Sequence, residues 1–119
     1  MTFLASCSEA FKTIDAKKFN EKIATRTDIK TPQELIKLYY DYSESAGNPK
    51  LTIEAKDLGN NSFEIILIQE GFEDDSQSSQ KIVMTAKQTG LTWIVKEIKE
   101  NWKCWDGRGQ TSWGIRPCN

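Results

Sequence analysis

Histidine is absent from this chain of 119 residues. Because histidine is the commonest general acid or base and the commonest neutral metal ligand, its absence excludes Ser–His and Cys–His catalytic pairs and histidine-based metal sites. The three cysteines cannot complete a four-ligand zinc site, and none forms a C-x-x-C pair. We therefore expect no metal ion and no cofactor.

Long apolar runs and an excess of charge of either sign are also missing. No apolar run approaches the length of a transmembrane helix. The chain has 16 basic and 17 acidic residues and a formal net charge of −1, so it has no general attraction for nucleic acid or for an anionic membrane. With 38% hydrophobic and 28% charged residues, the composition is typical of one folded domain rather than of a disordered chain.

Two of the three cysteines, Cys104 and Cys118, bracket a tail that contains three glycines and a proline. Glycine and proline at this density argue against a helix or strand. A disulfide that closes a loop of this size would contribute roughly 3 kcal/mol to stability. We predict this disulfide and, with it, a location outside the cytoplasm. The alternative is two unlinked thiols in a cytosolic protein.

The third cysteine lies in Leu4-Ala5-Ser6-Cys7, which resembles the lipobox of bacterial lipoproteins. The resemblance implies a lipid on Cys7, attachment to a membrane only through that lipid, and a place in the bacterial cell envelope, in the periplasm or as an outer-membrane lipoprotein. A lipoprotein signal has a basic and an apolar region before the box, whereas only Met1, Thr2 and Phe3 stand there. Either the chain starts late or the match is chance. We expect residues 1–7 to be a remnant of such a segment and residues 8–119 to form a single domain.

Helical patterns dominate the first part of the domain. Residues 8–24 carry two apolar sets that are out of phase near Lys17-Lys18, which predicts a bent helix or two short helices. Thr31-Pro32-Gln33-Glu34 has the residues of a capping box with proline at the first helical position. An apolar stripe follows at Leu35, Leu38, Tyr39 and Tyr42, and the helix is expected to stop before Ala46-Gly47-Asn48-Pro49.

After residue 50 the apolar period changes to two, which predicts four strands. The first spans Leu51 to Ala55; the second, Phe63 to Gln69, is apolar on both faces and therefore needs a cover on each. Turns are expected at Leu58-Gly59-Asn60-Asn61 and at Gln88-Thr89-Gly90. An acidic loop is expected from Phe72 to Gln80, then a third strand from Lys81 to Lys87. A fourth strand is expected from Leu91 to Lys103, with Leu91, Trp93 and Val95 on one face and Ile94 and Ile98 on the other.

Helices followed by an antiparallel meander give an α+β fold, with the helices on the concave face of a curved four-stranded sheet and a disulfide-pinned C-terminal tail. The order of elements resembles the cystatin-like roll, including the NTF2-like families. The tail, Trp102-Lys103-Cys104 followed by Gly107-Arg108-Gly109, Trp113 and Cys118, resembles the ending of small bacterial exported proteins. That second resemblance implies export and the disulfide but no activity.

The tail also contains the candidate interaction residues Trp105, Arg108 and Trp113. Gly107-Arg108-Gly109 could form a backbone nest for an anion, although glycines that only let the chain turn are the simpler interpretation. Exposed tryptophan is enriched at binding hot spots. We expect Trp93 and Trp102 in the core, and leave open whether Trp105 and Trp113 pack over the disulfide or meet a partner.

Carboxylates are the only candidate catalytic groups in this sequence. Glu73-Asp74-Asp75 lacks the alternating ligand spacing of a calcium loop and is better explained as a solvated loop tip, and Asp41 and Glu44 as solubilising residues. We therefore expect a non-enzymatic protein that binds another protein, or its own copy through the doubly apolar sheet. The alternatives are a carrier of a small apolar ligand, with a pocket lined by Tyr39, Tyr42, Phe63 and Trp93, and a carboxylate enzyme.

Overall fold

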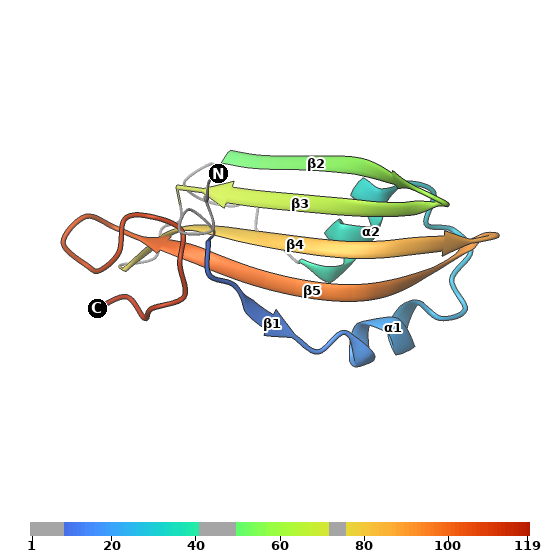
Figure 1. The fold of residues 1–119 in the computed structure, drawn as a ribbon, viewed down its shortest axis with the longest axis horizontal. Coiled ribbons are helices and arrows are strands. Elements are labelled where there is room, and N and C mark those ends of the chain that lie inside the picture. Colours follow the sequence, from blue (N-terminus) through green and yellow to red (C-terminus); the bar gives the residue numbers. More distant parts are fainter. Residues whose placement is uncertain (1–8, 41–49, 72–75) are drawn as a thin grey trace, which may run out of the picture.

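Five antiparallel strands form one sheet in the order β1-β5-β4-β3-β2 in the computed structural model, which describes residues 9–40, 50–71 and 76–119 (Figure 1). The strands are β1 (Lys12–Ile14), β2 (Lys50–Gly59), β3 (Ser62–Glu70), β4 (Gln77–Thr89) and β5 (Thr92–Cys104), and the helices are α1 (Lys17–Ile23) and α2 (Pro32–Tyr39). The α+β class and the antiparallel meander are confirmed. The expected count of four strands is wrong, because the chain adds β1 at the edge of β5.

Strand β1 lies where the sequence predicted helix. Ile14 pairs with Ile98 and Lys12 with Glu100 of β5. The prediction of helix over residues 8–24 is therefore correct only for α1, whose buried residues are Phe19 and Ile23. The pattern of residues 8–24 contains no information about the edge of β5. The unpaired backbone groups at that edge gain hydrogen bonds when the N-terminal segment extends along them, and this favours a strand there.

Helix α2 begins as its sequence predicts. Thr31 accepts a hydrogen bond from the backbone N–H of Glu34, and the Glu34 carboxylate accepts one from the N–H of Thr31. The helix ends at Tyr39, because Tyr40 is already extended; residues 41–49, including Tyr42, lie outside the described residues. Its fully buried side chains are Leu35 and Ile36.

The long hairpins differ in their turns. Between β2 and β3, Asn60 and Asn61 both have positive φ, the conformation of a tight two-residue turn that matches the strand twist. Between β3 and β4 the expected acidic loop is shorter than predicted, since β4 already begins at Gln77; residues 72–75 lie outside the described residues. The four residues from Gln77 to Gln80 are polar, so their place in a strand is set by pairing with β3 and β5 rather than by an apolar pattern.

A bulge in β5 changes which face the strand buries. Thr85 pairs with Glu97 whereas Ala86 pairs with Val95, so β5 has one extra residue, Lys96, at this point. An extra residue shifts the alternation of faces by one. Ile98 therefore joins Val95 in the core, and its expected place beside Ile94 on the opposite face is wrong.

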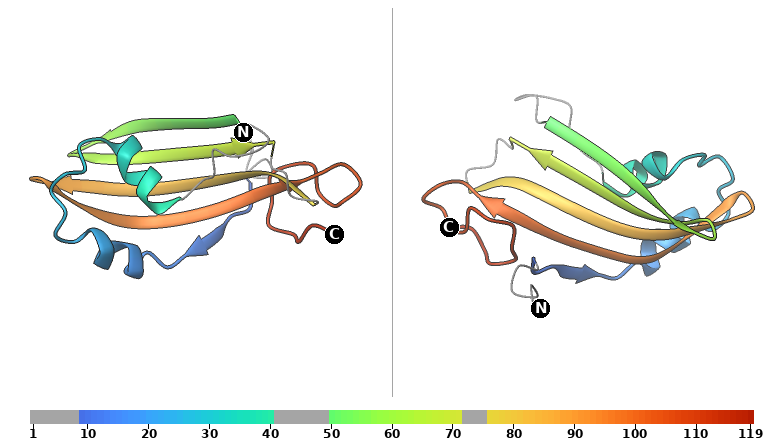
Figure 2. Two further views of the ribbon diagram at one scale, coloured as in Figure 1. Left: turned by 180° about the vertical axis from the view of Figure 1, so that it is seen from behind. Right: turned by 45° about the horizontal axis from the view of Figure 1, so that its top comes forward.

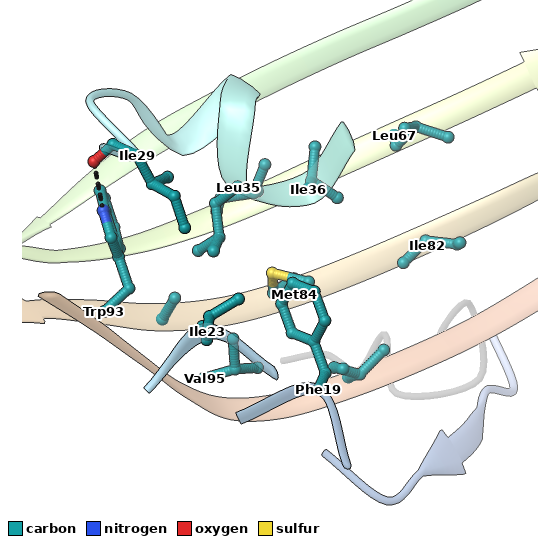
Figure 3. Packing of buried hydrophobic residues seen from close by; sticks show 13 residues of the cluster. Phe19, Ile23, Ile29, Leu35, Ile36, Leu67, Ile82, Met84, Trp93 and Val95 are labelled. Carbon is teal, nitrogen blue, oxygen red and sulfur yellow. Dashed lines mark hydrogen bonds between the residues drawn. The ribbon is translucent and has the colours of Figure 1, made fainter. Parts of the chain in front are cut away.

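Both helices lie against one face of the sheet, α2 against β2 and β3 and α1 against β5 (Figure 2). The buried side chains of α1 and α2 pack in one cluster with Leu67, Met84 and Val95 from the sheet (Figure 3). Trp93 is 2% exposed and donates its indole N–H to the carbonyl oxygen of Ile29 at 2.9 Å. This bond satisfies the one polar group of a large core side chain and fixes the linker between the helices.

Candidate functional site

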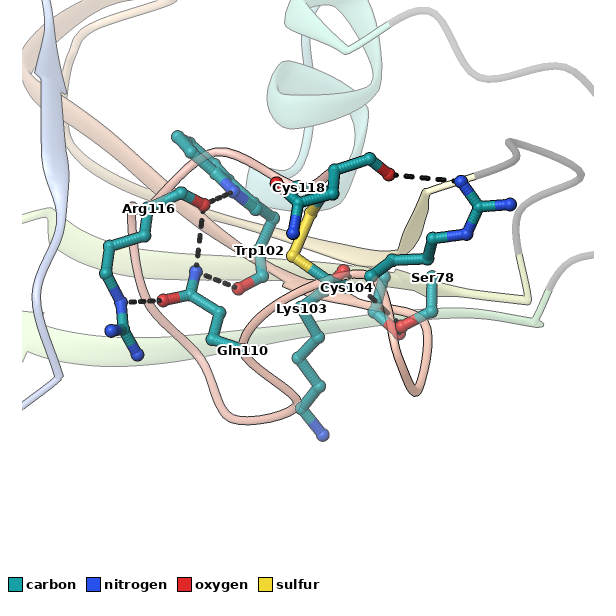
Figure 4. The surroundings of a disulfide bond; sticks show 10 residues. Ser78, Trp102, Lys103, Cys104, Gln110, Arg116 and Cys118 are labelled. Atoms are coloured by element: carbon teal, nitrogen blue, oxygen red, sulfur yellow. Dashed lines mark hydrogen bonds between the residues drawn. A yellow bond between two sulfur atoms is a disulfide. The ribbon is translucent and has the colours of Figure 1, made fainter.

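The predicted disulfide is present between Cys104 and Cys118, with an S–S distance of 2.05 Å and a Cα–Cα distance of 5.5 Å (Figure 4). It joins the last residue of β5 to the penultimate residue of the chain. Gly109 packs directly on it: a Cβ at this position would lie 2.9 Å from the Sγ of Cys104, and the φ of Gly109 is +143°. Only glycine fits here without displacement.

The tail inside this loop folds back on β5. Trp102 and Gly114 exchange two backbone hydrogen bonds, of 2.9 and 3.0 Å, which forms a single antiparallel bridge. The indole of Trp102 donates to the carbonyl of Arg116 at 2.9 Å, so Trp102 holds the tail and is not the core residue that the sequence predicted (Figure 4). The side chain of Gln110 bridges the carbonyl of Arg116 and its guanidinium.

The tail residues predicted for interaction are in different settings. Trp105 is 41% exposed. Arg108 donates from its guanidinium to the backbone carbonyl of Asn119 at 3.3 Å, and its own carbonyl accepts from the N–H of Asn119. These contacts tie Arg108 to the end of the chain. Trp113 is half-buried and lies among lysines of the sheet face opposite the helices.

That opposite face carries an open groove of about 420 Å³. We call it the outer groove and define it by the residues that line it: Glu9, Phe11, Glu64, Ile66, Lys81, Val83 and Lys99. Strands β3, β4 and β5 provide the floor, and the segment before β1 provides one wall. The groove is therefore built from residues far apart in sequence.

Lys81 is the centre of this surface. Its side chain is 12% exposed, and its Nζ donates to Glu9 Oε1 at 2.7 Å. The same Nζ lies 4.5 Å from the ring centroid of Trp113 and 5.9 Å from that of Phe11. A lysine held this closely needs a compensating carboxylate, which Glu9 supplies, and ring faces add a smaller attraction.

Glu9 is positioned by a second donor. Burial alone would raise its pKa, but hydrogen bonds from Lys81 and Asn101 outweigh burial and lower the pKa of Glu9 below its ordinary value. Asn101 is fully buried and donates to Glu9 Oε1 at 3.0 Å and to the carbonyl of Ala10 at 3.1 Å. Asn101 Oδ1 has no hydrogen-bond donor in the described part of the structure.

Two further lysines extend the surface on either side. Lys99 Nζ lies 4.8 Å from the ring centroid of Phe11, and Lys103 Nζ lies 4.7 Å from that of Trp113. Within residues 9–40, 50–71 and 76–119, neither ammonium has a carboxylate within 4 Å. We call Phe11, Lys81, Lys99, Lys103 and Trp113 together the cation–aromatic row.

The residues predicted to line an apolar pocket are packed against one another or against the core. Phe63 and Trp93 are 5.7 Å apart between ring centroids, and Tyr39 meets Phe19 edge to face at 5.4 Å. Tyr42, the fourth, lies outside the described residues. The packing gives Tyr39, Phe63 and Trp93 a role in the core.

A polar cluster borders the core on the helix side. The hydroxyl of Tyr40 lies 2.6 Å from Gln69 Oε1 and 3.1 Å from Gln80 Oε1, and the amide of Gln80 donates to Glu100. Burial, reinforced by the negative charge of Glu100, raises the pKa of Tyr40 to about 12. The hydroxyl therefore stays protonated at neutral pH.

The described parts of the chain contain neither a cluster of metal ligands nor a membrane-spanning helix. No group of three or more cysteine, aspartate or glutamate side chains there is placed to hold a metal ion. No helix in those ranges is long and apolar enough to cross a membrane. Cys7, Asp41, Glu44 and Glu73-Asp74-Asp75 lie outside them.

Sequence reasoning found Trp113 but missed the rest of the cation–aromatic row. Phe11 lies in the segment 8–24 that was predicted to be helical, and no role was predicted for Lys81, Lys99 or Lys103. One signal was present: Lys99 and Lys103 share a strand face with Asn101 between them. Nothing local shows that Phe11 and Trp113 come to the same face.

In comparisons with known proteins, no family model, curated protein or solved structure matches this chain.

Proposed function

We propose that this chain is a non-enzymatic exported protein that binds an acidic segment of a protein partner along the outer groove. The observation that carries the proposal is the state of Lys99 and Lys103. Their ammonium groups lie over aromatic rings, with no carboxylate within 4 Å in the part of the chain that is described. With Lys103 beside the groove, three lysines (Lys81, Lys99 and Lys103) stand against the two carboxylates of the lining, Glu9 and Glu64. The surface therefore carries a local excess of one positive charge on a chain whose net charge is −1.

The groove offers a matching mixture of contacts. Ile66 and Val83 form an apolar floor, while Phe11 supplies an aromatic wall. Lys81 is already neutralised by Glu9, so it acts as a fixed support for both rings rather than as a free charge. A partner segment that alternates carboxylates with apolar side chains would complement this arrangement, since complementary charge sets orientation and apolar contact adds affinity.

Export and lipid attachment at Cys7 belong to the same proposal. The disulfide supports a compartment in which thiols are oxidised. The likeness to cystatin-like and NTF2-like rolls, based on the order of elements, also stays a proposal. Intact mass measured on protein extracted from the bacterial envelope tests this part: an acyl mass on Cys7 together with the loss of two hydrogens supports it, whereas an unmodified chain with free thiols contradicts it.

Binding is tested with the full chain and a short synthetic peptide of alternating glutamate and phenylalanine, followed by calorimetry. A peptide of alternating lysine and phenylalanine is the control for apolar contact alone. We expect the acidic peptide to bind and the basic peptide to bind far more weakly. Equal binding of both, or of neither, contradicts an acidic partner.

Matched charge variants locate the site. Lys99→Glu and Lys103→Glu are each expected to weaken binding about tenfold, equivalent to about 1.4 kcal/mol. Lys96→Glu, at the exposed bulge of β5 and outside the groove lining, changes net charge by the same amount. Long-range electrostatic attraction changes equally in the three variants. If Lys96→Glu still binds the acidic peptide, the weaker binding of the other two variants is assigned to the groove surface. Equal loss of binding in all three variants argues against this site.

A further inference from the structure

At one side of the sheet the long strand β5 is covered by other segments, whereas the described structure leaves the strand at the opposite edge, β2, open. The edge of β5 is covered by β1 over residues 98–100 and by the tail at Trp102, which bonds to Gly114. The other edge is β2, which pairs with β3 on one side; no described segment pairs with its other side. Residues 54–59 of this strand are exposed. A long open edge is a template for another strand unless charges or bulges block it.

We propose that a second copy of this chain pairs with β2 in antiparallel fashion about a two-fold axis at Ala55. In this arrangement Glu54 of each copy lies opposite Lys56 of the other, and Ala55 lies opposite Ala55. Both charged side chains are on one face, since Glu54 pairs with Ile66 and Lys56 with Glu64 in their own hairpin, and Ile66 and Glu64 both line the outer groove. The pairing therefore joins two opposite-charge contacts on the same side of one continuous sheet.

The order of charged residues along β2 favours an axis at Ala55 over axes at the neighbouring residues. Moving the axis by one residue toward the N-terminus places Glu54 opposite Glu54, and moving it by one residue toward the C-terminus places Lys56 opposite Lys56. An axis at Ile53 places Lys50 opposite Lys56. Like charges directly opposite each other destabilise a strand pair. An axis at Thr52 also avoids like charges, but it pairs only residues 50–54, whereas the axis at Ala55 reaches residues 51–59. The pairing of β2 with β3 is regular up to Asp57 and shifts between Asp57 and Gly59, so residues 53–57 are the regular centre of this contact.

The dimer is expected to be weak, because the contact consists of one strand pair and few side chains. The dimer contact and the proposed partner contact use different residues: the dimer uses the β2 edge, and the partner uses the groove over β3, β4 and β5. Because Glu54 and Lys56 lie next to the groove residues Ile66 and Glu64, Lys99 on β5 is the position that separates the two contacts.

Charge reversal gives a sharp test by sedimentation equilibrium at micromolar to millimolar concentration. The unmodified chain is expected to dimerise. Glu54→Lys places lysines opposite lysines, and Lys56→Glu places glutamates opposite glutamates, so each variant alone is expected to dimerise at least about tenfold more weakly. A mixture of the two variants restores both opposite-charge contacts and is expected to recover the affinity, as is the double variant.

Recovery in the mixture is the control for folding, because a misfolded variant could not be rescued by its partner. In a Cys7→Ser background, which removes the third cysteine of the sequence, oxidised Ala55→Cys is expected to cross-link as a dimer, whereas Lys50→Cys is not. A strictly monomeric unmodified chain, a mixture that fails to associate, or cross-linking at Thr52→Cys in place of Ala55→Cys would each overturn the proposal. Lys99→Glu, which alters the groove alone, should leave the dimer unchanged.

Discussion

Ile94 and Ile98 lie on opposite faces of β5, although four positions along a regular strand would place them on the same face. Ile94 is 49% exposed and pairs with Lys87, whereas Ile98 is fully buried and pairs with Met84. The bulge at Lys96 causes the change. It turns the end of β5 so that Lys99, Asn101 and Lys103 reach the outer face.

The bulge leads to a matched pair of stability predictions. Ile98→Ala should cost about 2–5 kcal/mol, because it removes a core side chain and leaves a cavity. Ile94→Ala should change stability by no more than about 0.5 kcal/mol, as surface substitutions usually do. Urea denaturation followed by fluorescence measures both. Similar costs for the two variants would contradict the observed change of face.

Replacing both Cys104 and Cys118 with serine should lower the free energy of unfolding by about 3 kcal/mol, the cost expected for opening a loop of this size. The tail should also lose its fixed place, so the near-ultraviolet circular dichroism of Trp102 and Trp113 should weaken below the unfolding transition. Thr111→Ala, an exposed change within the same loop, is the control. Unchanged dichroism in the serine variant would show that the hydrogen bonds of the tail suffice.

Acid should weaken the contact between Glu9 and Lys81. The folded pKa of Glu9 lies below its ordinary value, so the carboxylate stabilises the fold above about pH 4.3, the value for unfolded chains. This contribution disappears as the pH falls through the lower, folded pKa. Glu9→Gln should therefore be less stable than the unmodified chain at neutral pH, and the difference should shrink as acid is added.

Denaturation of both proteins across this pH range measures the effect. Glu97→Gln removes a carboxylate from an exposed position and is the matched control. A stability difference that stays constant with pH would contradict an electrostatic role for Glu9.

Alkaline pH should lower the stability of the fold, because Tyr40 holds its proton more tightly in the folded protein than in the unfolded chain. The unfolded chain releases a tyrosine proton near pH 10, while the folded protein holds that of Tyr40 until about pH 12. Protonation therefore favours the folded state below pH 10, and this contribution falls as the pH rises between those values. In an absorbance titration the last tyrosine to ionise should be missing from Tyr40→Phe. A variant that keeps this late phase would assign it to another tyrosine.

The parts of the fold predicted correctly have local causes. The start of α2 is decided by Thr31, Pro32 and Glu34, which satisfy backbone groups within one turn. The turn at Asn60-Asn61 needs residues that accept positive φ, and asparagine does. The disulfide follows from cysteines that bracket a segment without regular structure. For the helix start and the turn the deciding residues are neighbours, and for the disulfide they are 14 positions apart.

The incorrect predictions have causes that lie elsewhere in the chain. The segment before α1 becomes a strand because β5 offers it an edge, and Trp102 leaves the core because the carbonyl of Arg116 takes its N–H. The cation–aromatic row was missed for the same reason, since Phe11 and Trp113 meet at Lys81 only through the paired strands.

The sequence by itself determined the fold class, the capped helix, the hairpin turns and the disulfide, because each depends on contacts within a few residues or on the chemistry of a single residue type. Only the tertiary structure decided the edge strand, the face of Ile98 and the assembly of Phe11, Lys81 and Trp113 beside one groove. Those features depend on strand register and on a one-residue bulge. Register is set by the sum of many distant contacts, and a shift of one residue exchanges the two faces of a strand.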